Sequence, residues 1–243
     1  MIPEDHPRYR SLVVRESLAR YAKAGVVTLE GLTAHGRGEA FDYLIGEETM
    51  ESALLAEHTA AALLYSAHDP VISVNGNTAA LAAEELAHLQ KISGVAVEVN
   101  LFHRTPSRIK KVTRLLEDSG VVVLHGKRER LLPLSHERAF CLRHGIFSAD
   151  VVLVPLEDGD RCKALVSMGK KVIVIDLNPL SRSARYANLT IVDELTRALP
   201  RIGGFLVGMD EKTAAQLISS MNNYYFLEEA IKEIARRLAH ALD

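Results

Sequence analysis

The chain has 243 residues, of which 48% are hydrophobic, and its formal net charge at pH 7 is −2. This length can bury one large core, and a charge so close to zero gives no field that would favour nucleic acid as a partner. The polar N-terminus, the lack of any apolar stretch of ~20 residues and the two cysteines outside a C-x-x-C motif predict a cytoplasmic protein without a membrane partner.

The first part of the chain, residues 1–69, is predicted to be helical. Apolar periodicity predicts helices over His6–Ala24 and Glu47–His68. Between them, Thr28–Gly46 carries Arg37 with a glycine on each side, and Glu39–Leu44 is typical of a helix. Such glycines allow the backbone to approach a ligand that the guanidinium then reaches. A flexible connection with a charged tip is the alternative interpretation of this segment.

Residues 70–200 alternate between short Val- and Ile-rich runs and helical patterns. The predicted strands are Val71–Val74, Val95–Val99, Val121–Leu124, Val151–Val154, Val172–Ile175 and Leu189–Val192. The predicted helices are Thr78–Ile92, Ser107–Ser119, Ser135–His144, Asp160–Met168 and one that starts at Asp193. Runs that are apolar at successive positions are typical of parallel strands buried on both faces. We therefore predict an α/β fold with a Rossmann-like, doubly wound and mostly parallel sheet.

Residues 201–243 are predicted to add C-terminal helices to the same domain, so that residues 1–243 form one α/β unit. The pair Gly203-Gly204 interrupts the preceding helical pattern, and helices are expected over Asp210–Met221 and Tyr224–Leu242. The apolar stripe of the last helix favours packing on its own domain over use as a dimer surface.

The junction Asn75-Gly76-Asn77-Thr78 stands between a strand and a run of helix-forming residues. At such a junction, backbone N–H groups and the positive end of the helix dipole can hold an anion. We interpret it as a ligand loop, although a strand-to-helix turn that binds nothing is the alternative.

Other strand-end loops carry charge as well. Four cations lie in them: Arg104, Lys127, Arg128 and Arg182. Four cations beside amide-rich turns suggest a polyanionic ligand such as a nucleoside triphosphate. Asp176 can accept from a ribose hydroxyl or an amino group, and Asn178 and Ser183 add neutral donors. The chain has neither a P-loop nor a G-x-S-x-G motif, so an enzyme here would act by positioning and charge stabilisation.

Five segments together carry a family resemblance: IPEDHPRYRSL, GLTAHGRGEAFDYLIGE, PVISVNGNTAAL, EVNLFHRT and DLNPLSRSA. In this order, across nearly the whole chain, they resemble the archaeal-type 4-phosphopantoate–β-alanine ligases, also called phosphopantothenate synthetases. The resemblance implies a cytosolic homodimer with a Rossmann-like sheet. It implies that 4-phosphopantoate is joined to β-alanine in coenzyme A biosynthesis, with ATP converted through an acyl-adenylate to AMP and pyrophosphate, and with Mg²⁺ present.

Site residues are predicted from the resemblance together with the strand-end loops. Nucleotide contacts fall on Arg15, Arg37, Asp176, Leu177, Asn178, Arg182, Ser183, Asp193 and Glu194. Catalytic roles are predicted for Asn75, Asn77 and Arg104. Contacts with 4-phosphopantoate or β-alanine are predicted for Gly76, Thr78, His125 and Lys127. No residue is assigned to the metal.

Two other functions remain open. A nucleotide-binding regulatory protein would bind ATP without forming product. Another ATP-dependent acid–amine ligase would prefer a different amine, and competition among amines in one assay distinguishes it from the β-alanine ligase.

Overall fold

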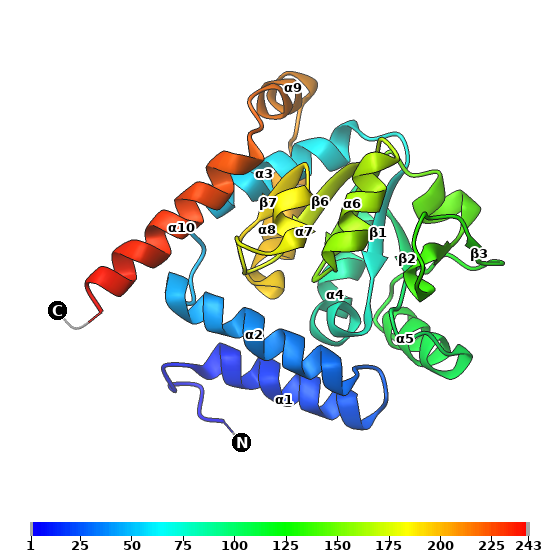
Figure 1. Cartoon of the computed structure of the whole chain (residues 1–243), viewed down its shortest axis with the longest axis horizontal. Helices are drawn as coiled ribbons and strands as arrows, with labels where there is room; N and C mark the ends of the chain where they lie inside the picture. Colours follow the sequence, from blue (N-terminus) through cyan, green and yellow to red (C-terminus); the bar gives the residue numbers. More distant parts are fainter. Residues whose placement is uncertain (1, 242–243) are drawn as a thin grey trace.

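The computed structural model describes residues 2–241 and contains a central sheet of five parallel strands (Figure 1). The strands are β1 (Pro70–Val74), β2 (Ala96–Val99), β5 (Val151–Pro155), β6 (Lys171–Ile175) and β7 (Leu189–Ile191). Their spatial order is β2-β1-β5-β6-β7, and helices cover both faces. The prediction of a doubly wound α/β fold is confirmed, and the strand order reverses between β1 and β5, where such folds place their ligands.

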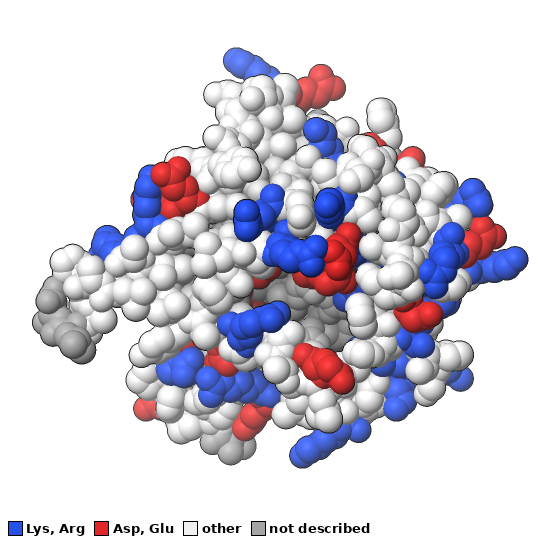
Figure 2. Space-filling model, in the orientation of Figure 1, with Lys and Arg blue, Asp and Glu red and all other residues white. Residues whose placement is uncertain are grey.

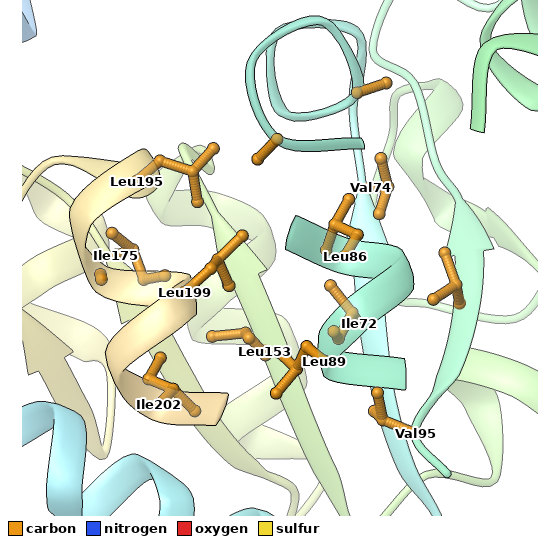
Figure 3. Close-up of a cluster of buried hydrophobic side chains, with 14 of the residues drawn as sticks. Ile72, Val74, Leu86, Leu89, Val95, Leu153, Ile175, Leu195, Leu199 and Ile202 are labelled. Atoms are coloured by element: carbon orange, nitrogen blue, oxygen red, sulfur yellow. The ribbon is translucent and has the colours of Figure 1, made fainter. Parts of the chain in front are cut away.

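The strands bury alternate side chains against different helices. Ile72 and Leu153 belong to a core shared with α4 (Gly76–Ser93) and α8 (Leu195–Leu206), as Figure 3 shows. Their neighbours Val71 and Val152 point to the other face, in a core shared with α6 (Gly159–Ser167). Each fully buried aliphatic side chain stabilises the fold by roughly 1.5–3 kcal/mol, so the sheet gives the loops at its ends a rigid base.

The N-terminal part begins with two helices, α1 (Tyr9–Lys23) and α2 (Leu29–Ile45). The glycine-rich segment was predicted to be helical only over Glu39–Leu44, but it lies within one continuous helix. Thr28 caps this helix by accepting from the Gly31 N–H, and Gly46 ends it in the left-handed region. The interpretation of Thr28–Gly46 as a flexible connection is therefore wrong.

Helix α2 runs past the carboxyl ends of the sheet strands (Figure 1). Near its start, the Gly31 carbonyl accepts from Asn77 Nδ2, at the start of α4. Near its end, Asp42 pairs with Arg197 of α8, just beyond β7. The helix thus forms a wall opposite the strand ends.

The remaining helices are α3 (Glu51–Ser66), α5 (Pro106–Asp118), α7 (Arg182–Tyr186), α9 (Glu211–Ser219) and α10 (Asn223–Ala239). The predicted end of the last helix at Leu242 lies outside the described residues. The predicted break at Gly203-Gly204 is wrong, because α8 continues through both glycines to Leu206. Gly203 is buried near Leu89 of α4, and this packing stabilises the helix. In residues 2–241, no helix is long and apolar enough to cross a membrane.

The predicted strand Val121–Leu124 is reduced to a single parallel bridge between Val97 and Val123. The Leu124 N–H also donates to the Val97 carbonyl at 2.8 Å. The segment lies at the edge beside β2, and Val122 is 75% exposed, so burial on both faces does not extend to it. The prediction of a full strand over Val121–Leu124 is therefore wrong.

The predicted helix Ser135–His144 is also wrong. The segment contains a 3₁₀ turn, strand β4 (Phe140–Cys141), which pairs with β3 (Glu129–Arg130), and the start of a wide turn. The buried Glu98 carboxylate accepts from the backbone N–H groups of Leu142 and Ile146. A side chain from β2 therefore satisfies backbone donors that helix formation would otherwise pair.

Candidate active site

Asn75 joins two strands at the point where the strand order reverses. Its Oδ1 accepts from the Thr78 N–H at 3.0 Å and caps α4. Its Nδ2 donates to the carbonyl oxygens of Pro155 and Leu156, at 3.1 and 3.0 Å. Leu156 holds a left-handed backbone conformation (φ 54°), which is strained for a leucine. The Asn75 amide is thus occupied by the scaffold and holds the ends of β1 and β5 together.

Gly76 and Asn77 form the first turn of α4 against neighbouring segments. A Cβ on Gly76 would collide with the Val26 carbonyl oxygen, which itself accepts from Arg108 Nε at 3.0 Å. Asn77 Nδ2 donates to the Gly31 carbonyl at 2.8 Å. The glycine is therefore required by close backbone approach, and the loop Asn75–Thr78 is rigidly packed between α1–α2 and α5.

The loop after β6 is organised by Asp176. Its carboxylate accepts from the Asn178 N–H at 3.0 Å and from the Ser181 hydroxyl at 2.5 Å. Burial raises the pKa of Asp176, whereas these bonds and the positive charge of Arg37 lower it. Arg37 is exposed on α2 and lies close enough to this loop for its charge to act on Asp176.

The starts of α6 and α7 meet beside that loop. The Ser183 hydroxyl donates to the Glu157 carbonyl at 2.6 Å, and Arg182 pairs with Asp160 at the surface. A Cβ on Gly159 would collide with Arg182, so the two helix starts abut at this glycine. Arg182 remains 62% exposed and can reach an anionic ligand.

Beyond β7, Asp193 is buried and bound by cations. It lies 2.6 Å from Arg197 Nη2 and accepts from the Thr49 hydroxyl at 2.5 Å. Glu194 caps α8 by accepting from the Thr196 N–H at 2.7 Å, and burial raises the pKa of its carboxyl.

A cavity of about 300 Å³ opens between the N-terminal segment, α2 and the loops after β6 and β7. Its lining includes Arg8, His35, Glu39, Asp42, Leu177, Glu194 and Arg197. Figure 2 shows a hollow on this side of the molecule, with Lys or Arg side chains on both of its rims. Arg15 binds Glu39, with Nε 2.8 Å from Oε1, and so orders one wall from α1. The lining is mostly charged and polar, with Val14 and Leu177 among its few apolar side chains. Its arginines suit a ligand that carries phosphates.

Known proteins resemble this chain over most of its length. The model of the phosphopantothenate/pantothenate synthetase family matches residues 52–237. A 4-phosphopantoate–β-alanine ligase of Methanospirillum hungatei is 57% identical over the full length of both chains. Ligases of the same name from Methanosarcina mazei and Thermococcus onnurineus are 52% and 48% identical. These two alignments cover 98% and 92% of this chain, and 95% and 87% of the relatives.

The chain belongs to the phosphopantothenate/pantothenate synthetase family. The resemblance found in the sequence is confirmed. In this family member, the structure brings most of the predicted nucleotide residues to the loops after β6 and β7 and to the facing side of α2. It brings Asn75–Thr78 to the adjacent switch point between β1 and β5.

Three predicted site residues of this synthetase-family chain lie elsewhere along the same edge. Arg104 packs over the Phe140 ring, and its Nε finds no hydrogen-bond acceptor in the part of the chain described. His125 Nε2 lies 2.8 Å from Glu117 on the surface, and Lys127 is exposed. Their predicted roles stay predictions.

One buried charge network was missed. Glu157, directly after β5, is 1% exposed and contacts both Arg138 and Arg161, and Arg161 Nη2 donates to Ser73 of β1 at 3.0 Å. The signal available in the sequence was the position of Glu157 at the end of a strand. Its arginine partners stand 19 residues before it and 4 residues after it in the sequence. No local sequence pattern predicts that these arginines pair with Glu157.

Proposed function

We propose that this chain joins 4-phosphopantoate to β-alanine and forms 4′-phosphopantothenate in coenzyme A biosynthesis. ATP drives the reaction and leaves as AMP and pyrophosphate. One observation carries the proposal: the segments after β1, β6 and β7 and the facing side of α2, far apart in the sequence, meet at one edge of the sheet. Full-length similarity to named 4-phosphopantoate–β-alanine ligases supports it.

The first step joins two anions. The carboxylate of 4-phosphopantoate attacks the α-phosphorus of ATP, the bond to the β-phosphate oxygen breaks, and pyrophosphate leaves. Cations must offset the repulsion between the reactants. Arg37 is exposed and forms no ion pair with another residue in 2–241, and Arg182 pairs with Asp160 at the surface. Both guanidinium groups are free to turn toward phosphates.

The nucleoside part of ATP fits the cavity beside Leu177. Glu194 and Asp176 are acceptors held in fixed positions by the Thr196 and Asn178 N–H groups. Acceptors in such positions suit the ribose hydroxyls and the amino group of the base.

The loop Asn75–Thr78 suits the second substrate and the acyl transfer. Its side-chain amides and the Thr78 N–H are used by the scaffold, so the groups that it can offer to a ligand are the backbone N–H groups of Gly76 and Asn77. These donors would orient the carboxylate of 4-phosphopantoate for attack. The amine of β-alanine then attacks the acyl carbon and expels AMP.

We propose Mg²⁺ as a partner of the triphosphate. In residues 2–241, no three His, Cys, Asp or Glu side chains form a group that could hold a metal ion. An ion that arrives bound to ATP needs few protein ligands. It can keep phosphate oxygens and water as most of its ligands, since Mg²⁺ gives up water reluctantly. When bound, the ion would neutralise phosphate charge beside Arg37 and Arg182.

The test is the formation of AMP by the purified protein with ATP, 4-phosphopantoate and β-alanine. We expect AMP and 4′-phosphopantothenate in equal amounts, and none with unphosphorylated pantoate. ATP binding without product would favour a regulatory protein. Preference for glycine or γ-aminobutyrate in a competition assay would indicate a different acid–amine ligase.

We also propose a homodimer in the cytoplasm. Phe226 and Leu227 of α10 are buried on the domain, as predicted for its apolar stripe, but Tyr224 and Leu238 are 81% and 57% exposed. The helix extends from the body of the molecule in Figure 1, which leaves this face open for a second copy. Both cysteines are buried and unpaired, as is usual in a reducing compartment. Sedimentation equilibrium at several protein concentrations tests the dimer, and a monomer throughout would contradict it.

A further inference from the structure

Glu57 of α3 is a buried carboxyl group for which the proposed mechanism has no use. It is 0% exposed, and neither of its oxygens accepts a hydrogen bond in the described part of the chain. Its closest cation is Arg201, whose Nε lies 4.0 Å from Glu57 Oε2. Because an unpaired buried carboxylate costs several kcal/mol, Glu57 needs either a donor or a proton.

A second buried carboxylate, Asp193, lies at the same guanidinium as Glu57: Arg201 Nε is 4.0 Å from Glu57 Oε2, and Arg201 Nη1 is 3.8 Å from Asp193 Oδ2. Two carboxylates this close repel each other unless one carries a proton, which can then form a hydrogen bond between them. Asp193 accepts hydrogen bonds from the Thr49 hydroxyl, the Glu194 N–H and Arg197. These bonds stabilise its ionised form. The proton therefore belongs on Glu57.

The net charge of the groups around Glu57 also favours a proton on Glu57. The charged groups that act on Glu57 are Asp193, which follows β7, and Arg197 and Arg201 of α8. Arg197 also binds Asp42 of α2, at 2.5 Å. With Glu57 neutral, two carboxylates face two arginines and the cluster has no net charge. Burial, followed by the charge of Asp193, raises the pKa of Glu57 to about 9, which agrees with this assignment.

We propose that Glu57 is a positioning residue that keeps a proton at neutral pH and donates it to Asp193. The bond holds Asp193 against Arg197, and Arg197 with Asp42 lines the cavity where the nucleotide is proposed to bind. Glu57 thus has no contact with the ligand itself and positions the cavity wall indirectly, through Asp193. This role in binding rests on the proposed function, whereas the proton on Glu57 does not.

The proton can be tested without any substrate. In the infrared difference spectrum between the natural protein and Glu57→Gln near neutral pH, we expect to lose the C=O band of a protonated carboxylic acid, which shifts in D₂O. Glu51→Gln changes an exposed glutamate on the same helix and should lose only a carboxylate band. Loss of a carboxylate band in Glu57→Gln as well would overturn the proposal.

The positioning role is tested by calorimetric titration with ATP near pH 7 and near pH 10. The natural protein should bind ATP about tenfold more weakly at the higher pH, as Glu57 loses its proton. Glu57→Gln keeps a donor without a titrating group, so its affinity should match the natural protein near pH 7 and lack that alkaline loss. Glu57→Leu cannot donate and should bind weakly at both pH values.

The proposal is overturned if Glu57→Gln shows the same alkaline loss as the natural protein, or if Glu57→Leu binds ATP normally. Should Glu57→Leu fail to fold, the Gln variant alone still decides the matter. Failure of the proposed function looks different: the natural protein would then form no β-alanine-dependent AMP, while the infrared result would stand.

Discussion

Asn75 illustrates how a residue predicted to be catalytic can serve the site by holding it together. Its amide caps α4 and spans from β1 to the carbonyl groups of Pro155 and Leu156. The strained Leu156 backbone depends on this bond, because nothing in its own side chain favours the left-handed region. The Asn75 side chain therefore helps to hold β1 and β5 together at the switch point.

Replacing Asn75 by Ala should lower the free energy of unfolding by about 2–3 kcal/mol, since a cap and two buried bonds are lost. Thr105→Ala is the matched control. Thr105 caps α5 by accepting from the Arg108 N–H and has no bond to another strand. Its loss should cost about 1 kcal/mol in the same urea titration. Equal losses for the two variants would show that the bonds to β5 contribute nothing.

Arg37 is the residue for which activity and stability should separate most clearly. It is exposed on α2, and its role is predicted to lie in contact with phosphates. Arg37→Ala should lower β-alanine-dependent AMP formation by about a hundredfold or more. The free energy of unfolding should change by less than about 0.5 kcal/mol, as for other surface positions. Arg114→Ala, an exposed arginine on α5, should leave both quantities unchanged, and normal turnover in Arg37→Ala would refute the assignment.

At the level of single residues, the sequence predicts which side chains cap helices and follow strands. The local pattern placed Asn75 directly after a strand, but it predicted the helix only from Thr78 and did not show that Asn75 caps it. Its partners Pro155 and Leu156 are 80 and 81 residues away. The same holds for Glu57 and Asp193, which belong to different segments and meet only after α3 packs beside β7. Pairings of this kind depend on tertiary packing and not on local pattern.

Among the elements, the buried strands were predictable because both of their faces are covered. β5 and β6 read as continuous apolar runs for that reason. The wrong predictions concern two segments whose structure is not set by burial on both faces. Val121–Leu124 lies at an open edge, and Ser135–His144 has backbone donors satisfied by a glutamate of β2. The strand order was not predictable, since parallel strands are joined through helices of similar length.

The abutting starts of α6 and α7 give a prediction at this scale. A methyl group on Gly159 would overlap Arg182, so Gly159→Ala must push the two helices apart. We expect a loss of about 1–3 kcal/mol in the free energy of unfolding, as for other overpacked sites, together with weaker ATP binding.

Gly204→Ala is the control for that substitution. Gly204 lies in α8 with open space where a Cβ would stand. Alanine there should stabilise the protein by about 0.5–1 kcal/mol, because the unfolded chain loses freedom and the helix gains propensity. Thermal unfolding of both variants compares their stabilities. A Gly159→Ala protein as stable as the natural one would show that Arg182 moves aside at little cost.

Over the whole molecule, buried carboxyl groups set how stability varies with pH. Burial raises the pKa of Asp42, Glu57, Glu98, Asp176 and Glu194. A folded state that binds such protons more tightly than the unfolded state becomes less stable as pH rises from the unfolded pKa toward the folded one. For Glu57 this window runs from 4.5 to about 9. His35 acts in the opposite direction, because burial lowers its pKa from 6.5, but only below about pH 6.5.

The free energy of unfolding should therefore fall between about pH 7 and pH 8.5, where His35 is neutral in both states. Glu57 alone can contribute a slope of up to about 1.4 kcal/mol per pH unit. The buried thiols of Cys141 and Cys162 add to the fall near its alkaline end, since burial raises the pKa of each to about 12. Urea titrations across this range measure the slope. Stability that stays level or increases would mean that Glu57 is already ionised in the folded protein at neutral pH.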